Sequence, residues 1–246
     1  MLKVYKEEQT LLTCHCDLAG QWRPSAILET MQEIAGVHSE LLGVGRNALV
    51  QRAGVVWVLT RLEVVMDRYP KIGERISTET FPMPMRRWFC PRYFIFRDDS
   101  GAELGRAGSL WALLDLATRK MVAPDSVKKY LPDNSDMTAP MGLPATVTEV
   151  SGTLETGTLL PAYTDLDVNL HVNNTKYMDW CCNALGIDTM TNHCLRRFAV
   201  NYDTELRPGQ EVRTELRRLG SDFSFCGFHG DHRHFDVGGV LGERNA

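Results

Sequence analysis

The sequence lacks any apolar run of the length needed to cross a bilayer, which is about 20 residues. It also lacks a strong charge of either sign, because the formal net charge is −4 over 246 residues. The N-terminal stretch MLKVYKEEQT is too charged for the apolar segment of a secretory signal. We therefore predict no membrane association, no nucleic-acid partner and a cytoplasmic protein.

Paired cysteines and complete metal-ligand sets are also missing. The seven cysteines are odd in number and scattered, which is typical of reduced thiols in a cytosol. Cys14 and Cys16 make at most half a metal site, as do the late histidines His229, His232 and His234. No other residues complete a set with zinc spacing, so we expect neither a metal nor a cofactor.

What the sequence does contain is a series of strand and helix patterns. A strand is predicted within residues 2–16, and Pro24 suits the first position of a helix. Apolar residues at helical spacing from Ile27 to Leu42 form one wide stripe that stops at Gly43, which indicates a helix lying against a sheet. Further strands are predicted over 55–66, 75–81, 92–98 and 107–116.

The same pattern returns after a proline-rich stretch. Residues 131–161 hold four prolines with many Ser, Thr and Gly, so part of this stretch is predicted to be a linker. Beyond it, LRRFAV at 195–200 resembles LTRLEV at 59–64, and the Asp, Gly and Thr-Glu that follow keep their spacing. The chain is therefore predicted to duplicate one unit in which a helix packs on an antiparallel sheet, an α+β architecture.

One stretch of the second unit concentrates polar groups. From Asp165 to Asn173 polar residues alternate with Leu and Val, which predicts an extended segment with one apolar and one polar face. Helical spacing follows, and Asn173 or Asn174 is expected to cap that helix, whose free N–H groups favour negative charge. Caps and turns alone would explain one or two such residues. Three on one face predict a site of acid/base and electrostatic chemistry, made of Asp167, Asn169 and His171.

Aligning the two units tests this hypothesis. The alignment pairs CDLAGQWRPS at 16–25 with TDLDVNLHVN at 164–173, so that Ala19, Gln21 and Arg23 fall opposite the three polar residues. Tyr69 falls opposite Glu205. Because the first unit keeps the turn and the helix without the polar set, we predict that the second unit performs the chemistry while the first holds the substrate.

The stretch DLDVNLHVNNTKYMDW resembles the signature of the acyl-acyl carrier protein thioesterases, a two-hotdog family of plant plastids and bacteria. WVLTRLEVV and GSLWALLDLATRKMV are also similar to this family, and the resemblance covers nearly the full chain. It implies a tandem hotdog fold, with an N-terminal acyl-binding hotdog over 1–135, a linker over 136–160 and a catalytic hotdog over 161–246. The implied reaction is hydrolysis of fatty acyl-acyl carrier protein, which releases free fatty acid and terminates its synthesis.

Carried over by position, the family's catalytic set falls on Asp167, Asn169, His171 and Glu205. Family members often have a cysteine directly after that last acid, and Leu206 stands here, so the resemblance excludes a Cys–His mechanism. Two roles stay open for Asp167, which could orient His171 or attack the thioester itself. Glu205 could act as the base toward water.

The implied partner is an acidic acyl carrier protein that presents its acyl chain on a phosphopantetheine arm. Basic pairs are the candidates to meet it: Arg86-Arg87, Lys128-Lys129 and Arg217-Arg218. Met31 and Ile34 on the first helix are the candidates to line an acyl tunnel. An acyl-CoA thioesterase and a non-catalytic acyl-binding hotdog protein stay open as alternatives, and so does a homodimer.

Overall fold

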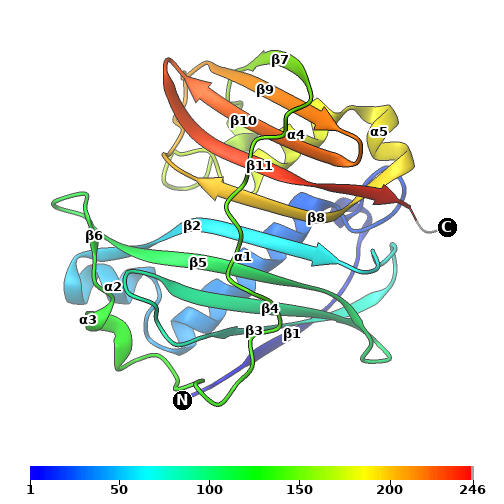
Figure 1. Ribbon diagram of the computed structural model, residues 1–246. Helices are drawn as coiled ribbons and strands as arrows, with labels where there is room; N and C mark the ends of the chain where they lie inside the picture. The colour runs from blue at the N-terminus through cyan, green and yellow to red at the C-terminus, as the bar shows by residue number, and fades with distance from the viewer. Residues whose placement is uncertain (245–246) are drawn as a thin grey trace.

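The computed structural model describes residues 1–244, in which a single antiparallel sheet runs through both halves of the chain (Figure 1). The strand order is β1-β3-β4-β5-β2-β8-β11-β10-β9-β7, with β6 paired to β5. The strands are β1 (Tyr5–Thr10), β2 (Val55–Met66), β3 (Arg75–Pro82), β4 (Cys90–Asp98), β5 (Glu103–Asp115), β6 (Met121–Val122), β7 (Thr153–Leu159), β8 (His193–Tyr202), β9 (Val212–Leu219), β10 (Asp222–His229) and β11 (His232–Glu243). The helices are α1 (Pro24–Leu41), α2 (Arg46–Ala53), α3 (Asp125–Lys128), α4 (Lys176–Leu185) and α5 (Ile187–Asn192), and the short 3-10 turns are η1 (Thr13–His15) and η2 (Tyr163–Asp165).

In the first half, strands β1-β3-β4-β5-β2 pack against α1, which lies behind the sheet in Figure 1. The helix begins at Pro24, as the sequence predicts. Its apolar stripe is buried from Ile27 to Ala35 in one core cluster with Phe94 and Phe96 of β4, whereas Leu41 near its end is 62% exposed. Each large apolar side chain buried in this way contributes about 1.5–3 kcal/mol. The stripe therefore determines which face of the helix meets the sheet.

The last turns of α1 bury a histidine. His38 is 0% exposed, and its Nε2 lies 3.1 Å from the Leu2 carbonyl oxygen. The Arg92 guanidinium lies 3.1 Å from His38 Nδ1. Burial, and then the positive charge of Arg92, lowers the pKa of His38 to about 4. This imidazole is therefore neutral in the folded protein near neutral pH.

The second half repeats the unit with a shorter helix. Strands β8-β11-β10-β9-β7 face α4, which has 10 residues where α1 has 18. Phe235 of β11 is fully buried under this helix, with ring centroids 4.5 Å from Tyr177 and 6.0 Å from Trp180. Offset aromatic contacts of this kind add about 0.5–1.5 kcal/mol beyond the burial of area.

The two halves meet along β2 and β8, which pair antiparallel from Arg61↔Asn201 to Val65↔Arg197. One continuous core contains buried residues of both halves, and α1 contacts α4. Across the seam Arg197 Nε donates to Glu63 Oε1 at 2.6 Å, and the Glu63 side chain is only 7% exposed. The seam is thus both an apolar and a hydrogen-bonded contact.

The connection between the halves is shorter than predicted. Residues after α3 cross the face of the sheet, where the Ala145 N–H donates to Glu63 Oε2 at 2.8 Å (Figure 1). Thr153–Leu159, inside the predicted linker 136–160, form β7 and pair with β9, so that part of the prediction is wrong. Nearly all of β7 is exposed, because it is an edge strand of mostly polar residues, and such a strand has no apolar periodicity to reveal it.

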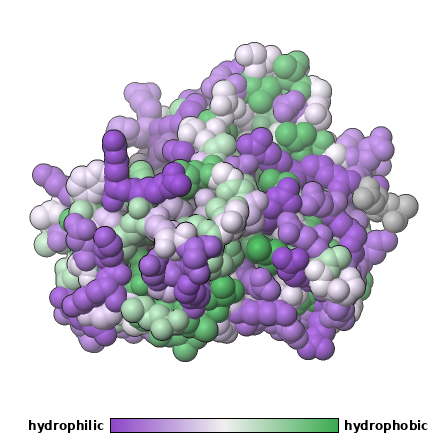
Figure 2. Space-filling view, turned by 60° about the horizontal axis from the view of Figure 1, so that its bottom comes forward, coloured by the Kyte–Doolittle hydropathy of each residue, from purple (hydrophilic) through white to green (hydrophobic). Residues whose placement is uncertain are grey.

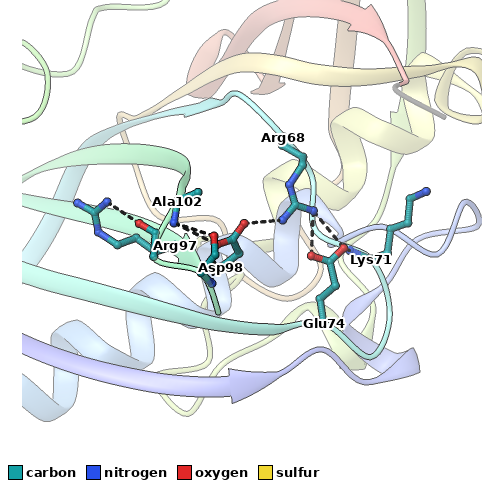
Figure 3. A network of polar contacts seen from close by, with 8 residues as sticks. Arg68, Lys71, Glu74, Arg97, Asp98 and Ala102 are labelled. Carbon is teal, nitrogen blue, oxygen red and sulfur yellow. Dashed lines mark hydrogen bonds and ion pairs between the residues drawn. The ribbon is translucent and has the colours of Figure 1, made fainter.

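Ion pairs hold the turn between β2 and β3 in the first half (Figure 3). Arg68 reaches Glu74 Oε2 at 2.8 Å and Asp98 Oδ2 at 3.1 Å, and the Lys71 N–H donates to Glu74 Oε1 at 2.8 Å. Because Arg68 is 41% exposed, these contacts are worth little individually. Their effect is to hold the turn that carries Tyr69.

On the face of the molecule drawn in Figure 2, apolar residues form small groups between hydrophilic ones. No helix within residues 1–244 has the length and apolar character needed to span a membrane.

Candidate active site

The stretch that alternation predicts to be extended is a closed turn. The Asp167 N–H donates to the His171 carbonyl at 2.8 Å, and the Leu170 N–H donates to the Asp167 carbonyl at 3.0 Å. Val168 is 94% exposed and Leu170 is 69% exposed, while Val172 is 5% exposed, so the four apolar residues do not form one buried face and the prediction is wrong. Alternation over so few residues does not separate a strand from a turn whose backbone is closed by its own side chains.

Asp167 is the side chain that closes this turn. Its Oδ1 accepts the Asn169 N–H at 2.8 Å and the His171 N–H at 3.3 Å. Its Oδ2 accepts from the Asn169 side-chain amide at 3.2 Å. Asp167 therefore positions both neighbours, His171 through the backbone and Asn169 through backbone and side chain.

The turn places His171 against Glu205. The Val172 N–H donates to the Leu206 carbonyl at 2.9 Å, which ties the turn to the segment after β8. As a result His171 Nε2 lies 3.4 Å from Glu205 Oε2. The side chains are 22% and 36% exposed, so water and substrate can reach the pair. Such an imidazole–carboxylate pair can move a proton.

Two arginines of the first half complete the site, and neither is among the residues that the sequence pattern predicts for it. Arg119, in the turn between β5 and β6, lies 3.0 Å from Glu205 Oε2. Arg46, the first residue of α2, donates to Asn169 Oδ1 at 2.9 Å. Arg207 lies further off, at 3.9 Å from the same Glu205 oxygen. Arg119 falls within GSLWALLDLATRKMV, a segment similar to the family. That similarity is the sequence signal that could have identified Arg119 as a site residue.

Helix α4 starts directly after the turn. Asn173 Oδ1 accepts the Thr175 N–H at 3.0 Å, so the first of the two predicted capping residues satisfies that N–H, although the helix proper begins at Lys176. Tyr177 is buried below the site. Burial raises its pKa, and the charge of Glu205 adds to that effect.

The same turn recurs in the first half, shifted by two residues from the predicted alignment. The Asp17 N–H donates to the Gln21 carbonyl at 2.8 Å, and Asp17 Oδ1 accepts the N–H groups of Ala19 and Gln21 at 2.9 and 3.1 Å. Asp17, Ala19 and Gln21 thus correspond to Asp167, Asn169 and His171. The three predicted pairings, Ala19 with Asp167, Gln21 with Asn169 and Arg23 with His171, are therefore wrong, because the ungapped alignment matched Asp17 with Asp165 instead of Asp167. The first half thus keeps the aspartate and lacks the asparagine and the histidine.

The predicted correspondence of Tyr69 with Glu205 agrees with the structure. The Trp22 N–H donates to the Pro70 carbonyl at 3.0 Å, as Val172 does to Leu206 in the second half. Tyr69 is 6% exposed, and its hydroxyl donates to the Leu195 carbonyl at 2.7 Å. The first-half position therefore holds a buried structural tyrosine where the second half presents a carboxylate.

An arginine from the end of the second half fills the first-half turn. The Arg244 guanidinium reaches Asp17 Oδ2 and Gln21 Oε1, both at 2.6 Å, and also the Met190 carbonyl. The side chains of Arg244 and Asp17 are 10% and 15% exposed. This turn is thus closed by an internal cation and has no free carboxylate for substrate.

The two predicted acyl-chain residues lie in the first-half core. Met31 and Ile34 are 4% and 2% exposed on the face of α1 turned to the sheet, and they share a core cluster with Phe94 and Phe96. The structure does not bring them together with the His171–Glu205 pair. Their role toward an acyl chain stays a prediction.

Sequence comparison connects these features to known proteins. The N-terminal domain of the acyl-ACP thioesterases matches residues 2–130, and the C-terminal domain matches residues 152–233. A chloroplastic palmitoyl-acyl carrier protein thioesterase of Arabidopsis thaliana is 26% identical over 223 residues, which are 84% of this chain and 54% of that protein. A chloroplastic dodecanoyl-[acyl-carrier-protein] hydrolase of Umbellularia californica is 27% identical over 219 residues, which are 84% of this chain and 57% of that protein. The chain spans about half the length of these curated relatives.

Solved structures match over nearly the whole chain. An acyl-ACP thioesterase from Bacteroides thetaiotaomicron superposes with a TM-score of 0.87 and 25% identity, covering 97% of this chain and 98% of the other. The 12:0-ACP thioesterase from Umbellularia californica shares the fold, with a TM-score of 0.83, 21% identity and coverage of 98% of each chain. These matches confirm the predicted tandem hotdog architecture, and with both domain matches they establish that the chain belongs to the acyl-ACP thioesterase family.

Proposed function

We propose that the protein hydrolyses the thioester of fatty acyl-acyl carrier protein and releases free fatty acid. The observation that carries the proposal is the His171–Glu205 pair, 3.4 Å apart and partly exposed, in which His171 belongs to the turn that bears the family signature. Thioester hydrolysis needs a base for water, donors for the developing oxyanion and a proton for the leaving thiolate. The turn and Glu205 together offer a group for each of these three needs.

In the proposed reaction Glu205 accepts a proton from water as the water oxygen bonds to the thioester carbonyl carbon. The charge that develops on the carbonyl oxygen meets N–H donors, for which the Asn169 amide is placed: one of its two N–H groups faces Asp167, and the other remains for substrate. The C–S bond then breaks, and the departing thiolate takes up a proton through His171. Each oxyanion donor of this kind contributes about a hundredfold to a thousandfold in turnover.

Direct attack by water is favoured over attack by Asp167. Both oxygens of Asp167 already accept hydrogen bonds within the turn, whereas every contact to Glu205 in residues 1–244 falls on Oε2 and leaves Oε1 for water. Acid quench during turnover followed by intact-mass analysis tests this directly. We expect no acylated enzyme, and an adduct on Asp167 would reverse the assignment.

A cysteine nucleophile is not supported. Cys181 is fully buried in α4, and burial raises its thiol pKa well above the usual range; burial also raises the pKa of Cys182 to about 12. Leu206, at the position where family members often have a cysteine, is 0% exposed. Thiols that stay protonated are poor nucleophiles. Single Cys→Ala variants are expected to keep their turnover.

The carrier protein is proposed to dock at the end of the molecule that holds the β5–β6 turn and α3 (Figure 1). Of the three basic pairs, Lys128-Lys129 lies at this end, because it closely follows β6 in the chain. Both lysines are exposed. Arg217 instead pairs with Glu149 at 3.0 Å, and Arg218 binds the Leu185 carbonyl. Their guanidinium groups therefore serve the fold.

Matched acyl-carrier-protein and acyl-CoA substrates over a series of chain lengths test the function. We expect hydrolysis of both, with the higher kcat/KM for the carrier protein. A K128E/K129E variant should raise KM for acyl-carrier protein and leave KM for acyl-CoA in place. Preference for acyl-CoA in the wild type would favour the alternative enzyme, and binding of acyl chains without hydrolysis would favour the non-catalytic one.

We also propose that the N-terminal hotdog, residues 1–135, binds the acyl chain and that the C-terminal hotdog is catalytic. The polar turn of the second half and the longer buried helix of the first support this division. A reducing compartment such as the cytoplasm is proposed as the site of action. All seven cysteines are free, which supports that compartment, while the plant relatives are named as chloroplastic.

A further inference from the structure

We propose that Arg119 of the first half is a positioning residue for catalysis in the second half: it holds the Glu205 carboxylate in the orientation that faces His171. Arg46 is proposed to do the same for the Asn169 amide. This inference rests on the proposed function of the His171–Glu205 site. It makes the first hotdog a part of the catalytic machinery in addition to a holder of substrate.

The geometry places one oxygen of Glu205 between two partners. Arg119 Nη2 lies 3.0 Å from Oε2, and His171 Nε2 lies 3.4 Å from the same atom. A carboxylate held at one oxygen keeps a fixed plane, so Oε1 points to a defined place where it can receive a proton from water. Without Arg119, the carboxylate would keep only His171 and the more distant Arg207, at 3.9 Å, to orient it.

The backbone of the β5–β6 turn supports the same conclusion. Arg119 has φ +57°, in the left-handed region that is unfavourable for a residue with a Cβ. Asp115 holds the turn in this shape, because its Oδ1 accepts the Thr118 N–H at 2.7 Å and its carbonyl accepts the Arg119 N–H at 2.9 Å. Glycine would suit this position better, so an arginine here is a feature for which a contact of its side chain can account. The contact it makes is with Glu205.

Asn169 is held in the same way from the first half. Arg46 donates to its Oδ1 at 2.9 Å, and its Nδ2 donates to Asp167 at 3.2 Å. These two bonds fix the amide plane and the direction of the remaining N–H. The second hotdog thus supplies the reacting groups, and one arginine from each of two first-half elements sets the orientation of two of them.

The test compares Arg119→Gln, Arg119→Lys and Arg46→Gln with the wild type. Two substrates are used, an acyl-carrier protein and a short acyl-pantetheine thioester that has no acidic carrier. We expect Arg119→Gln to lower kcat about tenfold or more on both, with little change in KM. Lys120→Gln is the matched control, because it removes a neighbouring exposed charge from the same turn and should behave as wild type.

The conservative variant separates positioning from a purely structural role. The charged and titratable groups facing Glu205 include Arg119, Arg207 and His171. Arg119→Lys keeps the charge without the guanidinium geometry, so its kcat should lie between those of the wild type and Arg119→Gln, with KM little changed.

A double variant completes the test. If Arg119 acts through Glu205, adding Arg119→Gln to Glu205→Gln should cause no further loss. Independent losses, an unchanged kcat in Arg119→Gln, or a loss confined to the acyl-carrier protein would each overturn the inference while leaving the proposed function intact. A folded wild type that hydrolyses neither thioester would overturn both.

Discussion

The two halves build one turn and use it for different purposes. In the first half Asp17 closes the turn, Arg244 fills it, and the Arg244 side chain is 10% exposed. In the second half Asp167 closes the turn, and the facing arginine, Arg119, is 54% exposed beside Glu205. Each turn thus faces an arginine from the opposite half.

The difference shows how a duplicated fold separates stability from chemistry. The first-half cation is buried on its aspartate and on carbonyl and amide oxygens, which stabilises the fold and excludes water. The second-half cation lies at the rim and contacts a carboxylate that water can reach. The first-half segment is also held by the Arg68 ion pairs (Figure 3), while the residue in the place of Arg68 is Thr204, which has no charge.

The largest expected effect is on the second-half turn. His171→Ala and Asn169→Ala should each lower turnover by about a hundredfold to a thousandfold, or about 2.7–4 kcal/mol, because each removes a group that acts in the transition state. Tyr69→Phe, in the position equivalent to Glu205, should stay within a few-fold of wild type. Steady-state turnover checks this, with thermal unfolding to verify the fold. Near-normal turnover in a folded His171→Ala would contradict the assignment of the site.

Arg244→Ala should have the opposite effect, a loss of stability without a loss of turnover. Removal of this guanidinium leaves the Asp17 carboxylate nearly buried without its partner, and breaking a buried pair in this way costs about 3 kcal/mol. Chemical denaturation should show the loss, while turnover per folded molecule should be retained. A stable but inactive Arg244→Ala would mean that the first-half turn has a part in the chemistry.

His38 makes the long helix of the first half sensitive to acid. The unfolded imidazole takes up a proton near its ordinary pKa of about 6.5, whereas the folded one does so only near 4. As pH falls through this window the unfolded state binds more protons, so up to about 3 kcal/mol of stability is lost. Unfolding of His38→Gln, measured between pH 7 and pH 4, should depend less steeply on pH. An equal slope for both proteins would exclude His38 as the cause.

A larger side chain on α1 should alter the preferred acyl-chain length, whereas a larger side chain on α4 should not. Met31→Phe or Ile34→Phe would shorten an acyl tunnel, and each excluded methylene is worth about 0.8 kcal/mol. Preference should move several-fold toward shorter chains for each two-carbon step. Ala184→Phe is the matched variant on α4 and should lower all chain lengths together. A shift caused only by Ala184→Phe would assign the acyl chain to the second half.

The smallest effect concerns backbone strain at matched positions. Leu170 has φ +59°, and its first-half counterpart Gly20 has φ +69°. Leu170→Gly should therefore stabilise the fold by about 1 kcal/mol, and Gly20→Ala should destabilise it by a similar amount. A Cβ at Gly20 would meet only Ile72 at 3.8 Å, so strain rather than a clash is tested. If the urea midpoints of the two variants do not move in opposite directions, the comparison is disproved.

Sequence alone was sufficient where the signal is local and periodic. The β2 strand over 55–66 and the start of α1 at Pro24 follow from β-branched runs, apolar spacing and proline chemistry, and the structure places both as predicted. Unusual polar density in one half of a repeat also points to Asp167, Asn169 and His171, whereas Glu205 is assigned only by the family resemblance. The structure brings these four side chains together.

Tertiary structure alone decided what depends on contact between distant residues. Alternation over 165–173 predicts a strand, yet the Asp167 carboxylate accepts two N–H groups and closes a turn that leaves Val168 and Leu170 exposed. Arg119 and Glu205 are 86 positions apart, and Arg244 and Asp17 are 227 apart, and no periodicity links residues at such separations. Only the pairing of β2 with β8 and the shared core bring the halves close enough for each to complete the other's turn.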